Sequence, residues 1–215
     1  MIINVIENKI SEYAVDLNKS IKDISILVSF SAGIDSTVLS SLMLELKTRY
    51  GFHLYLIHFN HNAHNKAKEM EDFCRSFARL NDLEFYTKKL IINNSSNFEA
   101  SAREKRYIDL ENMANHLKCD IVFTAHHKDD QIETLYMKKI DEADWISKIG
   151  IRENMGRIKR PLLEINKVVI AEIAKDRNLS WIEDPTNDDV SFRRNYIRIL
   201  LLPIAIKKYP RLVND

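Results

Sequence analysis

Short apolar segments alternate along this chain with longer segments whose apolar residues recur at helical spacing. The short segments have the length of strands and lie at residues 24–30, 53–59, 83–90, 120–124 and 158–163. The longer segments lie at residues 4–20, 38–46, 70–77, 96–117, 132–140, 168–178 and 192–208. Because parallel strands need helical crossovers between them, this order predicts an α/β fold. We expect a doubly wound, mainly parallel five-stranded sheet with helices on both faces. Pro161 confines the fifth strand to a strand end or a sheet edge.

The composition is that of an ordinary globular protein. The chain has 215 residues, of which 45% are hydrophobic, and a formal net charge of +1. Whole-chain charge therefore does not indicate a nucleic-acid partner. No apolar run approaches the roughly 20 residues that cross a bilayer, so we expect a cytoplasmic protein without a membrane partner. Cys74 and Cys119 are too far apart for a CxxC pair, which favours a reducing compartment.

The segment Ser31-Ala32-Gly33-Ile34-Asp35-Ser36 directly follows the first predicted strand. In parallel sheets ligands bind beyond the carboxyl ends of strands, and a helix N-terminus offers free N–H groups to an anion. Gly33 permits a left-handed backbone, and Asp35 suits a magnesium ion better than a bare phosphate. We interpret this loop as a phosphate-binding turn that is distinct from the GxxxxGK[ST] pattern. The alternative is a serine-rich helix N-cap.

A second polar segment, residues 126–134, follows the fourth predicted strand. It contains His126, Asp129, Asp130 and Glu133. Asp130 and Glu133 are three residues apart, so they share one helix face and could share a magnesium ion bound to phosphates. The alternative is an aspartate N-cap with a solvated glutamate.

Two arginines, Arg103 and Arg106, share one face of the helix predicted at 96–117. A capping box formed by Ser96 and Glu99 is expected to open that helix. The planar guanidinium donates two hydrogen bonds to a phosphate, which favours a role for these arginines at a nucleotide. The alternative is a salt-bridged surface helix.

Three histidines, His58, His61 and His64, have residue types that bind metals. A zinc site needs a closed ligand set, and neither cysteine has a matching spacing. We therefore interpret these histidines as residues that line a cleft or support the structure.

The loop at 31–36 resembles the SGGxDS signature of the PP-loop, or N-type ATP pyrophosphatase, superfamily, whose fold is adenine nucleotide α-hydrolase-like. The chain as a whole resembles one family within it, tRNA(Ile)-lysidine synthetase. The resemblance runs in order from about residue 24 to 210. The matching segments are 31–39, 58–61, 99–107, 126–134, 160–163, 181–187 and Arg194-Asn195-x-x-Arg198.

This resemblance implies a ligase that forms a carbon–nitrogen bond. ATP would adenylate O2 of the wobble cytidine of the isoleucine tRNA with a CAU anticodon, releasing pyrophosphate. The ε-amine of free L-lysine would then attack C2, and AMP would leave. The implied cofactors are ATP and Mg²⁺, and a homodimer is left open. The rivals are another PP-loop enzyme such as a tRNA 2-thiolation enzyme, which typically needs paired cysteines, and a non-catalytic nucleotide-binding or RNA-binding module.

The resemblance also assigns roles to residues. The implied catalytic residues are Asp35, Asp130, Glu133, Arg103 and Arg106, with Asp35 and Asp130 as metal ligands. Either Asp130 or Glu133 would receive the lysine amine. The implied nucleotide-binding residues are Ser31, Ala32, Gly33, Ile34, Asp35 and Ser36. The residues expected to line the tRNA cleft are His58, Asn60, His61, His126, Arg194, Asn195 and Arg198.

The chain departs from the family pattern at three places. Ala32 stands where the superfamily usually has glycine, which costs nothing if its φ is negative. The acidic residues 141–144 replace a glycine-rich loop. The usual C-terminal tRNA-binding domains are absent, so we expect 1–215 to be a single PP-loop catalytic domain with 141–215 as its helical C-terminal extension. The basic stretch 193–211 would contact the tRNA backbone, unless it is a solvated helix face.

Overall fold

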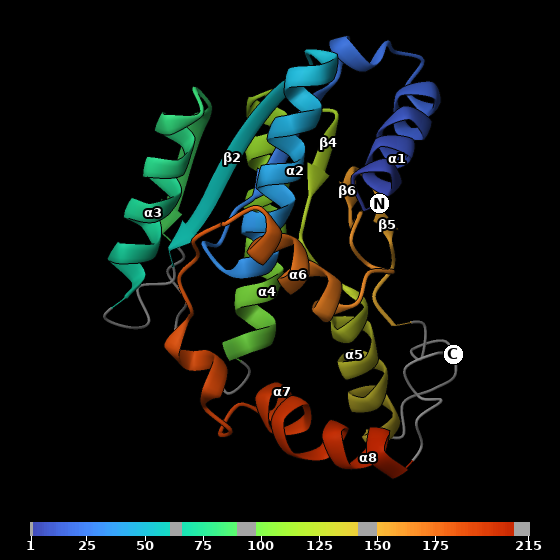
Figure 1. The fold of residues 1–215 in the computed structure, drawn as a ribbon, viewed down its shortest axis with the longest axis vertical. Helices are drawn as coiled ribbons and strands as arrows, with labels where there is room; N and C mark the ends of the chain where they lie inside the picture. Colours follow the sequence, from blue (N-terminus) through green and yellow to red (C-terminus); the bar gives the residue numbers. More distant parts are fainter. Residues whose placement is uncertain (1, 61–65, 90–97, 142–149, 209–215) are drawn as a thin grey trace.

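A six-stranded sheet forms the centre of the protein. The computed structural model describes residues 2–60, 66–89, 98–141 and 150–208 (Figure 1). The strands, in spatial order, are β3 (Glu84–Lys89), β2 (His53–Asn60), β1 (Ser25–Ser29), β4 (Ile121–Phe123), β6 (Ile158–Lys159) and β5 (Asn154–Met155). Every neighbouring pair is parallel except β5 and β6. The predicted doubly wound, mainly parallel sheet is therefore confirmed.

The sheet has one strand more than the five we expected. The additional strand, β5, is only two residues long, and a turn at Gly156 with a φ of 59° joins it to β6. Two residues are too few to produce an alternating pattern in the sequence. The strand expected at 158–163 ends at Lys159, because Pro161 has no N–H to donate to a neighbour.

Helices cover both faces of the sheet, as predicted. One face packs against α1 (Ile2–Asp16), α2 (Ile34–Tyr50), α3 (Ala67–Leu80) and α6 (Lys167–Asp176), and the other against α4 (Phe98–His116). Successive residues of β1 show this division. Ile26 and Val28 lie in the larger apolar cluster, while Leu27 lies in the smaller one with Leu110 of α4. This period of two is the one expected of a strand buried on both faces.

The remaining helices lie beyond the carboxyl ends of the strands (Figure 1). They are α5 (Lys128–Ile140), α7 (Arg193–Tyr196), a π-helical segment Ile197–Leu201 and α8 (Leu202–Lys208). Two 3₁₀ turns, Ile21–Asp23 and Pro185–Asp188, complete the elements. The sequence predicts a final helical stretch at 192–208 that is interrupted or bent near Pro203. The structure agrees, since the regular helix gives way to the π-helical segment Ile197–Leu201, which ends two residues before Pro203, a residue without an N–H to donate to the preceding turn.

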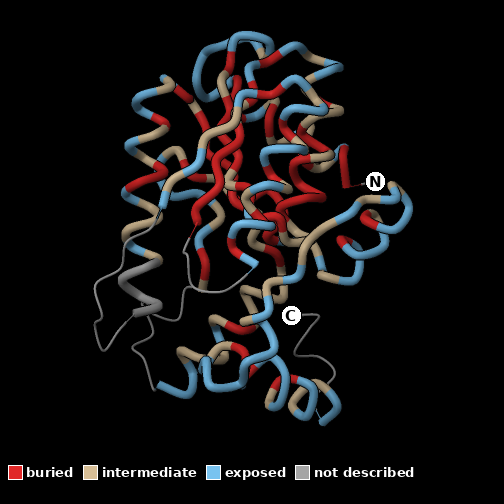
Figure 2. The backbone as a smooth tube through the Cα atoms, turned by 90° about the vertical axis from the view of Figure 1, so that its left-hand side faces the viewer, coloured by how far each residue is buried: buried red, intermediate tan, exposed pale blue. Residues whose placement is uncertain are grey.

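Buried residues concentrate around the sheet, whereas the segment from Pro185 to Lys208 is largely exposed (Figure 2). Helix α6 belongs to the buried part, because Ile170 and Ala174 are fully buried in the larger cluster. The division of the chain into one domain with a 141–215 extension stays a prediction. None of the described helices is long and apolar enough to cross a membrane.

The order of the strands defines where a ligand can bind. Strand β1 has β2 on one side and β4 on the other, so the connections after β1 and β4 diverge at this point of the sheet. Ligands of open α/β sheets bind in the crevice at such a point, outside the carboxyl ends of the strands. The loop at 31–36 and the segment at 126–134 follow β1 and β4, respectively.

Candidate nucleotide site at the ends of β1 and β4

The loop after β1 is folded on itself by hydroxyl groups. The backbone N–H of Ser31 donates to Ser36 Oγ at 3.1 Å, and Ser36 Oγ donates to the carbonyl of Gly33 at 3.0 Å. Thr37 Oγ1 donates to the same carbonyl at 3.0 Å. Helix α2 begins at Ile34, directly after Gly33. The loop therefore presents the positive end of α2 at the switch point, as an anion site requires.

The left-handed residue of this loop is Ala32, not Gly33. Ala32 has a φ of 70° and is fully buried, whereas Gly33 has an extended backbone with a φ of −71°. Gly33 does not use the left-handed backbone that a glycine permits. Because the φ of Ala32 is positive, the alanine at this position carries a conformational cost. A left-handed conformation costs an alanine roughly 1–2 kcal/mol. The carbonyl of Ala32 accepts a hydrogen bond from the N–H of Ile182 at 3.0 Å, which holds the residue in place.

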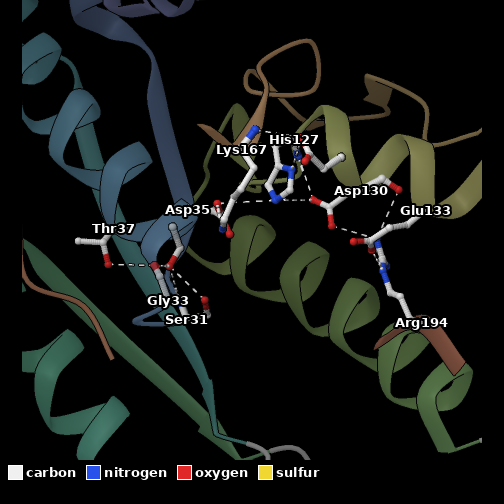
Figure 3. Close-up of polar contacts among 11 residues, drawn as sticks. Ser31, Gly33, Asp35, Thr37, His127, Asp130, Glu133, Lys167 and Arg194 are labelled. Atoms are coloured by element: carbon white, nitrogen blue, oxygen red, sulfur yellow. Dashed lines mark hydrogen bonds and ion pairs between the residues drawn. The ribbon is translucent and has the colours of Figure 1, made fainter. Parts of the chain in front are cut away.

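Asp35 lies in the first turn of α2 and pairs with a residue that the sequence did not indicate. Lys167 Nζ donates to Asp35 Oδ1 at 2.5 Å (Figure 3). His127 Nε2 is 3.7 Å from the same oxygen. Both groups come from elements that follow β4 and β6, so the carboxylate of Asp35 faces across the crevice toward the second polar segment.

His127 lies between the two aspartates that we expected to bind metal. Its Nε2 is 3.5 Å from Asp130 Oδ2, and its backbone N–H donates to the same oxygen at 2.9 Å. Burial raises the pKa of Asp130, but His127 and Arg194 outweigh it, so that the net pKa is below the ordinary value. Asp130 is therefore an ionised carboxylate. The structure brings the segments at 31–36 and 126–134 together at one edge of the sheet.

Glu133 and Asp130 share one arginine. Arg194 donates from Nε to Glu133 Oε2 at 2.6 Å and from Nη2 to Asp130 Oδ1 at 2.9 Å. The Glu133 side chain is 2% exposed, and its pKa is raised, because burial and the charge of Asp130 together outweigh Arg194. Arg194 was expected to line the tRNA cleft. In the structure it joins α7 to α5 through two carboxylates.

Arginines from two elements gather around Tyr107 of α4. Arg103 and Arg160 place their guanidinium carbons 5.5 and 5.7 Å from the centre of the Tyr107 ring. Each also donates from Nη2 to Tyr107 Oη, at 3.4 Å and 3.0 Å, respectively. Arg160 is 2% exposed, and its Nε has no hydrogen-bond partner among the described residues. Arg160 is a part of this cluster that we did not predict.

The same cluster contains Arg106 and His126. Burial lowers the pKa of Arg106, and the nearby Arg103 lowers it further. Burial also lowers the pKa of His126 to about 3, with Arg160 and Arg103 contributing, so His126 is neutral. His126 Nδ1 is 3.0 Å from Thr124 Oγ1. This concentration of guanidinium groups beside the switch point favours an anionic ligand.

Two further residues expected in the tRNA cleft make contacts within the core. His58 Nδ1 donates to the carbonyl of Phe30 at 2.9 Å, and burial lowers the pKa of His58. Asn60 Nδ2 donates to Glu71 Oε2 at 2.9 Å. Both residues are buried, which agrees with the structural interpretation of His58. His61, His64 and the predicted cap at Ser96 lie outside the described residues.

Asn195 and Arg198 hold a turn of the chain. Asn195 Nδ2 donates to the carbonyls of Thr186 and Asp189 at 2.7 and 2.9 Å. Arg198 Nη2 donates to the carbonyl of Asn187 at 2.6 Å. Part of the basic stretch therefore stabilises the 184–189 turn, and a tRNA contact by these residues stays a prediction.

The carboxylates fit a magnesium ion that arrives with phosphates. Among the described ranges, no group of three or more histidine, cysteine or acidic side chains is arranged to hold a metal. Mg²⁺ is commonly bound by one or two carboxylates together with substrate phosphates. Asp35, whose side chain is 26% exposed, offers such a ligand. Asp35 is paired with Lys167 and Asp130 with Arg194, so the roles of both aspartates as metal ligands stay predictions.

Residues 4–205 match the PP-loop domain family, and the chain belongs to this family. Among its relatives are tRNA(Ile)-lysidine synthases. The one from Buchnera aphidicola (subsp. Acyrthosiphon pisum) is 34% identical over 191 residues, which cover 86% of this chain and 43% of the relative. The one from Histophilus somni (strain 2336) is 35% identical over 205 residues, which cover 92% of this chain and 47% of the relative. The chain thus spans less than half the length of these relatives.

Two solved structures share the fold. A U34-tRNA thiolase, NcsA from Methanococcus maripaludis, superimposes with a TM-score of 0.71 at 17% identity, covering 98% of this chain and 75% of the thiolase. The NH3-dependent NAD synthetase from Campylobacter jejuni gives a TM-score of 0.56 at 15% identity, covering 100% of this chain and 93% of the synthetase. At such identities the likeness concerns the fold alone. The family membership itself supports ATP use.

Proposed function

We propose that this chain is the ATP-using part of a tRNA(Ile)-lysidine synthetase. The observation that carries the proposal is the meeting of the loop at 31–36 with the His127–Asp130 segment at the β1–β4 switch point. The similarity to named tRNA(Ile)-lysidine synthases over most of the chain supports the substrate. The substrates would be ATP, the isoleucine tRNA with a CAU anticodon, and free L-lysine.

The first step is the adenylation of the tRNA base. The cytidine O2 attacks the α-phosphorus of ATP, the bond to the bridging oxygen of the β-phosphate breaks, and pyrophosphate leaves. The N–H groups at the start of α2 would hold the phosphates, and Asp35 would hold Mg²⁺, which supplies charge neutralisation there. The arginines around Tyr107 would offset the charge that develops on pyrophosphate.

The second step is the attack of lysine. The ε-amine forms a bond with C2, the bond between C2 and O2 breaks, and AMP leaves with that oxygen. Lysine enters as an ammonium ion, which an ionised Asp130 can receive, but only the neutral amine attacks. Glu133 has a raised pKa and is therefore better suited than Asp130 to take the proton. Both carboxylates would have to exchange Arg194 for the lysine.

The cysteines favour lysidine synthesis over the alternative of tRNA 2-thiolation. Cys74 lies in the larger apolar cluster and Cys119 in the smaller one, on opposite faces of the sheet. Both are buried, and burial raises the pKa of each, that of Cys119 to about 12. A sulfur carrier needs an accessible thiolate, and neither residue provides one.

The decisive experiment measures pyrophosphate release and lysine incorporation together. The purified protein is given ATP, Mg²⁺, labelled lysine and an isoleucine tRNA transcript with a CAU anticodon; parallel reactions lack lysine, lack tRNA or contain methionine tRNA. Label in the isoleucine tRNA that depends on ATP supports the proposal. Pyrophosphate release without lysine incorporation indicates another PP-loop enzyme. No turnover with any tRNA indicates a non-catalytic module and contradicts the proposal.

A further inference from the structure

Lys167 holds a positive charge at the start of a helix, where such a charge is unfavourable. It is the first residue of α6, a helix of 10 residues. The N-terminus of a helix carries a partial positive charge, so a cationic side chain is repelled there unless an anion lies close by. In the structure that anion is Asp35, whose Oδ1 accepts a hydrogen bond from Lys167 Nζ at 2.5 Å.

The backbone of Lys167 is fixed against another helix. Its N–H donates to Asp129 Oδ1 at 2.9 Å, and the N–H of Lys128 donates to the carbonyl of Ile165 at 2.9 Å. Both bonds join the start of α6 to the start of α5. The side chain then reaches across to the start of α2, as Figure 3 shows. Lys167 therefore links the starts of three helices: its backbone joins α6 to α5, and its ammonium group joins α6 to α2 beside the loop at 31–36.

The contact between Lys167 and Asp35 cannot persist unchanged when a nucleotide is bound as proposed. A magnesium ion on Asp35 Oδ1 would repel an ammonium group at 2.5 Å from that oxygen, and His127 Nε2 already lies 3.7 Å from it. The Lys167 side chain is 37% exposed and has four rotatable carbons, so it can turn away from Asp35. The strongest negative charge then available to it is the phosphate chain.

We propose that Lys167 is a phosphate-binding residue of the nucleotide site. In the ligand-free protein Lys167 neutralises Asp35; when ATP and Mg²⁺ enter, the metal takes over Asp35 and the ammonium of Lys167 binds the β- or γ-phosphate. This role rests on the proposed use of ATP. It gives Lys167 a function in ATP binding that spacing in the sequence does not indicate, because Lys167 and Asp35 are 132 positions apart.

Calorimetric titration with two nucleotides tests the role of Lys167. The proteins compared are the wild type, Lys167→Met, Lys167→Arg and, as a matched control, Lys175→Met at the exposed end of the same helix. The probes are ATP with Mg²⁺ and AMP, which lacks the β- and γ-phosphates. We expect Lys167→Met to weaken ATP binding about tenfold or more and AMP binding less than twofold, because a charge-assisted contact to the outer phosphates is lost. Lys167→Arg should retain most of the ATP affinity, and Lys175→Met should bind both nucleotides like the wild type.

Two outcomes would overturn the role of Lys167. An equal loss of ATP and AMP affinity in Lys167→Met would show that the residue only supports the shape of the site. An unchanged ATP affinity would show that its ammonium does not contact phosphate. Thermal unfolding of each variant establishes that it is folded. If the wild type itself binds ATP no better than AMP, the proposed ATP site fails before Lys167 is tested.

Discussion

The backbone carbonyl of Ala32 accepts a hydrogen bond from the backbone N–H of Ile182 at 3.0 Å. This bond joins the loop after β1 to the chain segment that follows α6. Ala32 has a positive φ and no exposed surface, so the strained residue of the loop is enclosed on every side. The geometry of the loop therefore depends on a segment about 150 residues further along the chain.

Replacing Ala32 with glycine should change stability very little. Glycine would relieve a left-handed strain of roughly 1–2 kcal/mol. It would also lose a buried methyl group, worth about 0.8 kcal/mol, and add about 0.5–1 kcal/mol of backbone entropy to the unfolded chain. These terms nearly cancel, so we expect Ala32→Gly to alter the free energy of unfolding by less than about 1 kcal/mol, measured by urea denaturation. Ala32→Val should lose more than about 2 kcal/mol, because a β-branched residue tolerates a positive φ poorly. A large loss in Ala32→Gly would mean that packing of the methyl group outweighs the strain.

Replacing Asp35 with asparagine should abolish turnover while leaving the fold intact. The amide cannot hold Mg²⁺ as a carboxylate does, so pyrophosphate release should fall about 100-fold or more. The ion pair with Lys167 is partly exposed, and its loss should cost less than about 1 kcal/mol of stability. The assay is pyrophosphate release across a range of Mg²⁺ concentrations, with Asp176→Asn at the exposed end of α6 as the control. Wild-type rates in Asp35→Asn would remove Asp35 from the site.

The sheet and the position of the site were predictable because their signals are local. The β-branched run before Ser31 and the apolar run before Thr124 each mark a buried strand, and parallel strands end at the same edge. This reasoning brought Asp35 and Asp130 to one crevice. The two-residue strand β5 left no such signal, since its pattern is shorter than one period of alternation.

The partners within the site were not predictable, because tertiary packing brings them together. Nothing near Lys167 in the sequence indicates that its side chain reaches Asp35. Arg194 lies in a basic run, which favoured a tRNA contact, yet its guanidinium pairs with Glu133 through the packing of α7 on α5. Gly33 was the residue of the loop that could most easily adopt a positive φ, yet Ala32 adopts it. The backbone of Ala32 is held by its hydrogen bond to Ile182. This contact joins two distant parts of the chain, so no local sequence pattern indicates it.

Removing the charge of Arg194 should destabilise the protein strongly. Arg194→Met would leave the buried carboxylate of Glu133 and the half-buried carboxylate of Asp130 without their arginine, and breaking a buried ion pair costs about 3–5 kcal/mol. The matched control is Arg193→Met, since the pair of Arg193 with Asp141 is about half exposed and should contribute less than about 1 kcal/mol. Urea denaturation measures both variants. Adding Glu133→Gln to Arg194→Met should restore part of the loss, whereas simple additivity would show that Arg194 and Glu133 are not coupled.

Acid should destabilise the protein through His58. Burial lowers the pKa of this histidine, so the folded protein keeps it neutral, while the unfolded chain takes up a proton below a pH of about 6.5. The unfolded state then binds more protons, and the free energy of unfolding falls as the pH decreases from about 6.5 toward the folded pKa. The full contribution is present above pH 6.5. One such histidine changes the free energy of unfolding by at most about 1.4 kcal/mol for each pH unit.

His58→Asn isolates this contribution. The asparagine amide can still donate to the carbonyl of Phe30 but does not titrate, so the variant should lose part of the pH dependence between pH 6.5 and 5. Above pH 7.5 the difference in stability between the two proteins should be constant, because His58 is neutral in both states there. Urea denaturation at a series of pH values measures this. Equal slopes in the two proteins below pH 6.5 would mean that His58 becomes protonated in the folded state as readily as in the unfolded chain. Among the described residues, His126 would then be the next source of acid sensitivity to test, because burial also lowers its pKa.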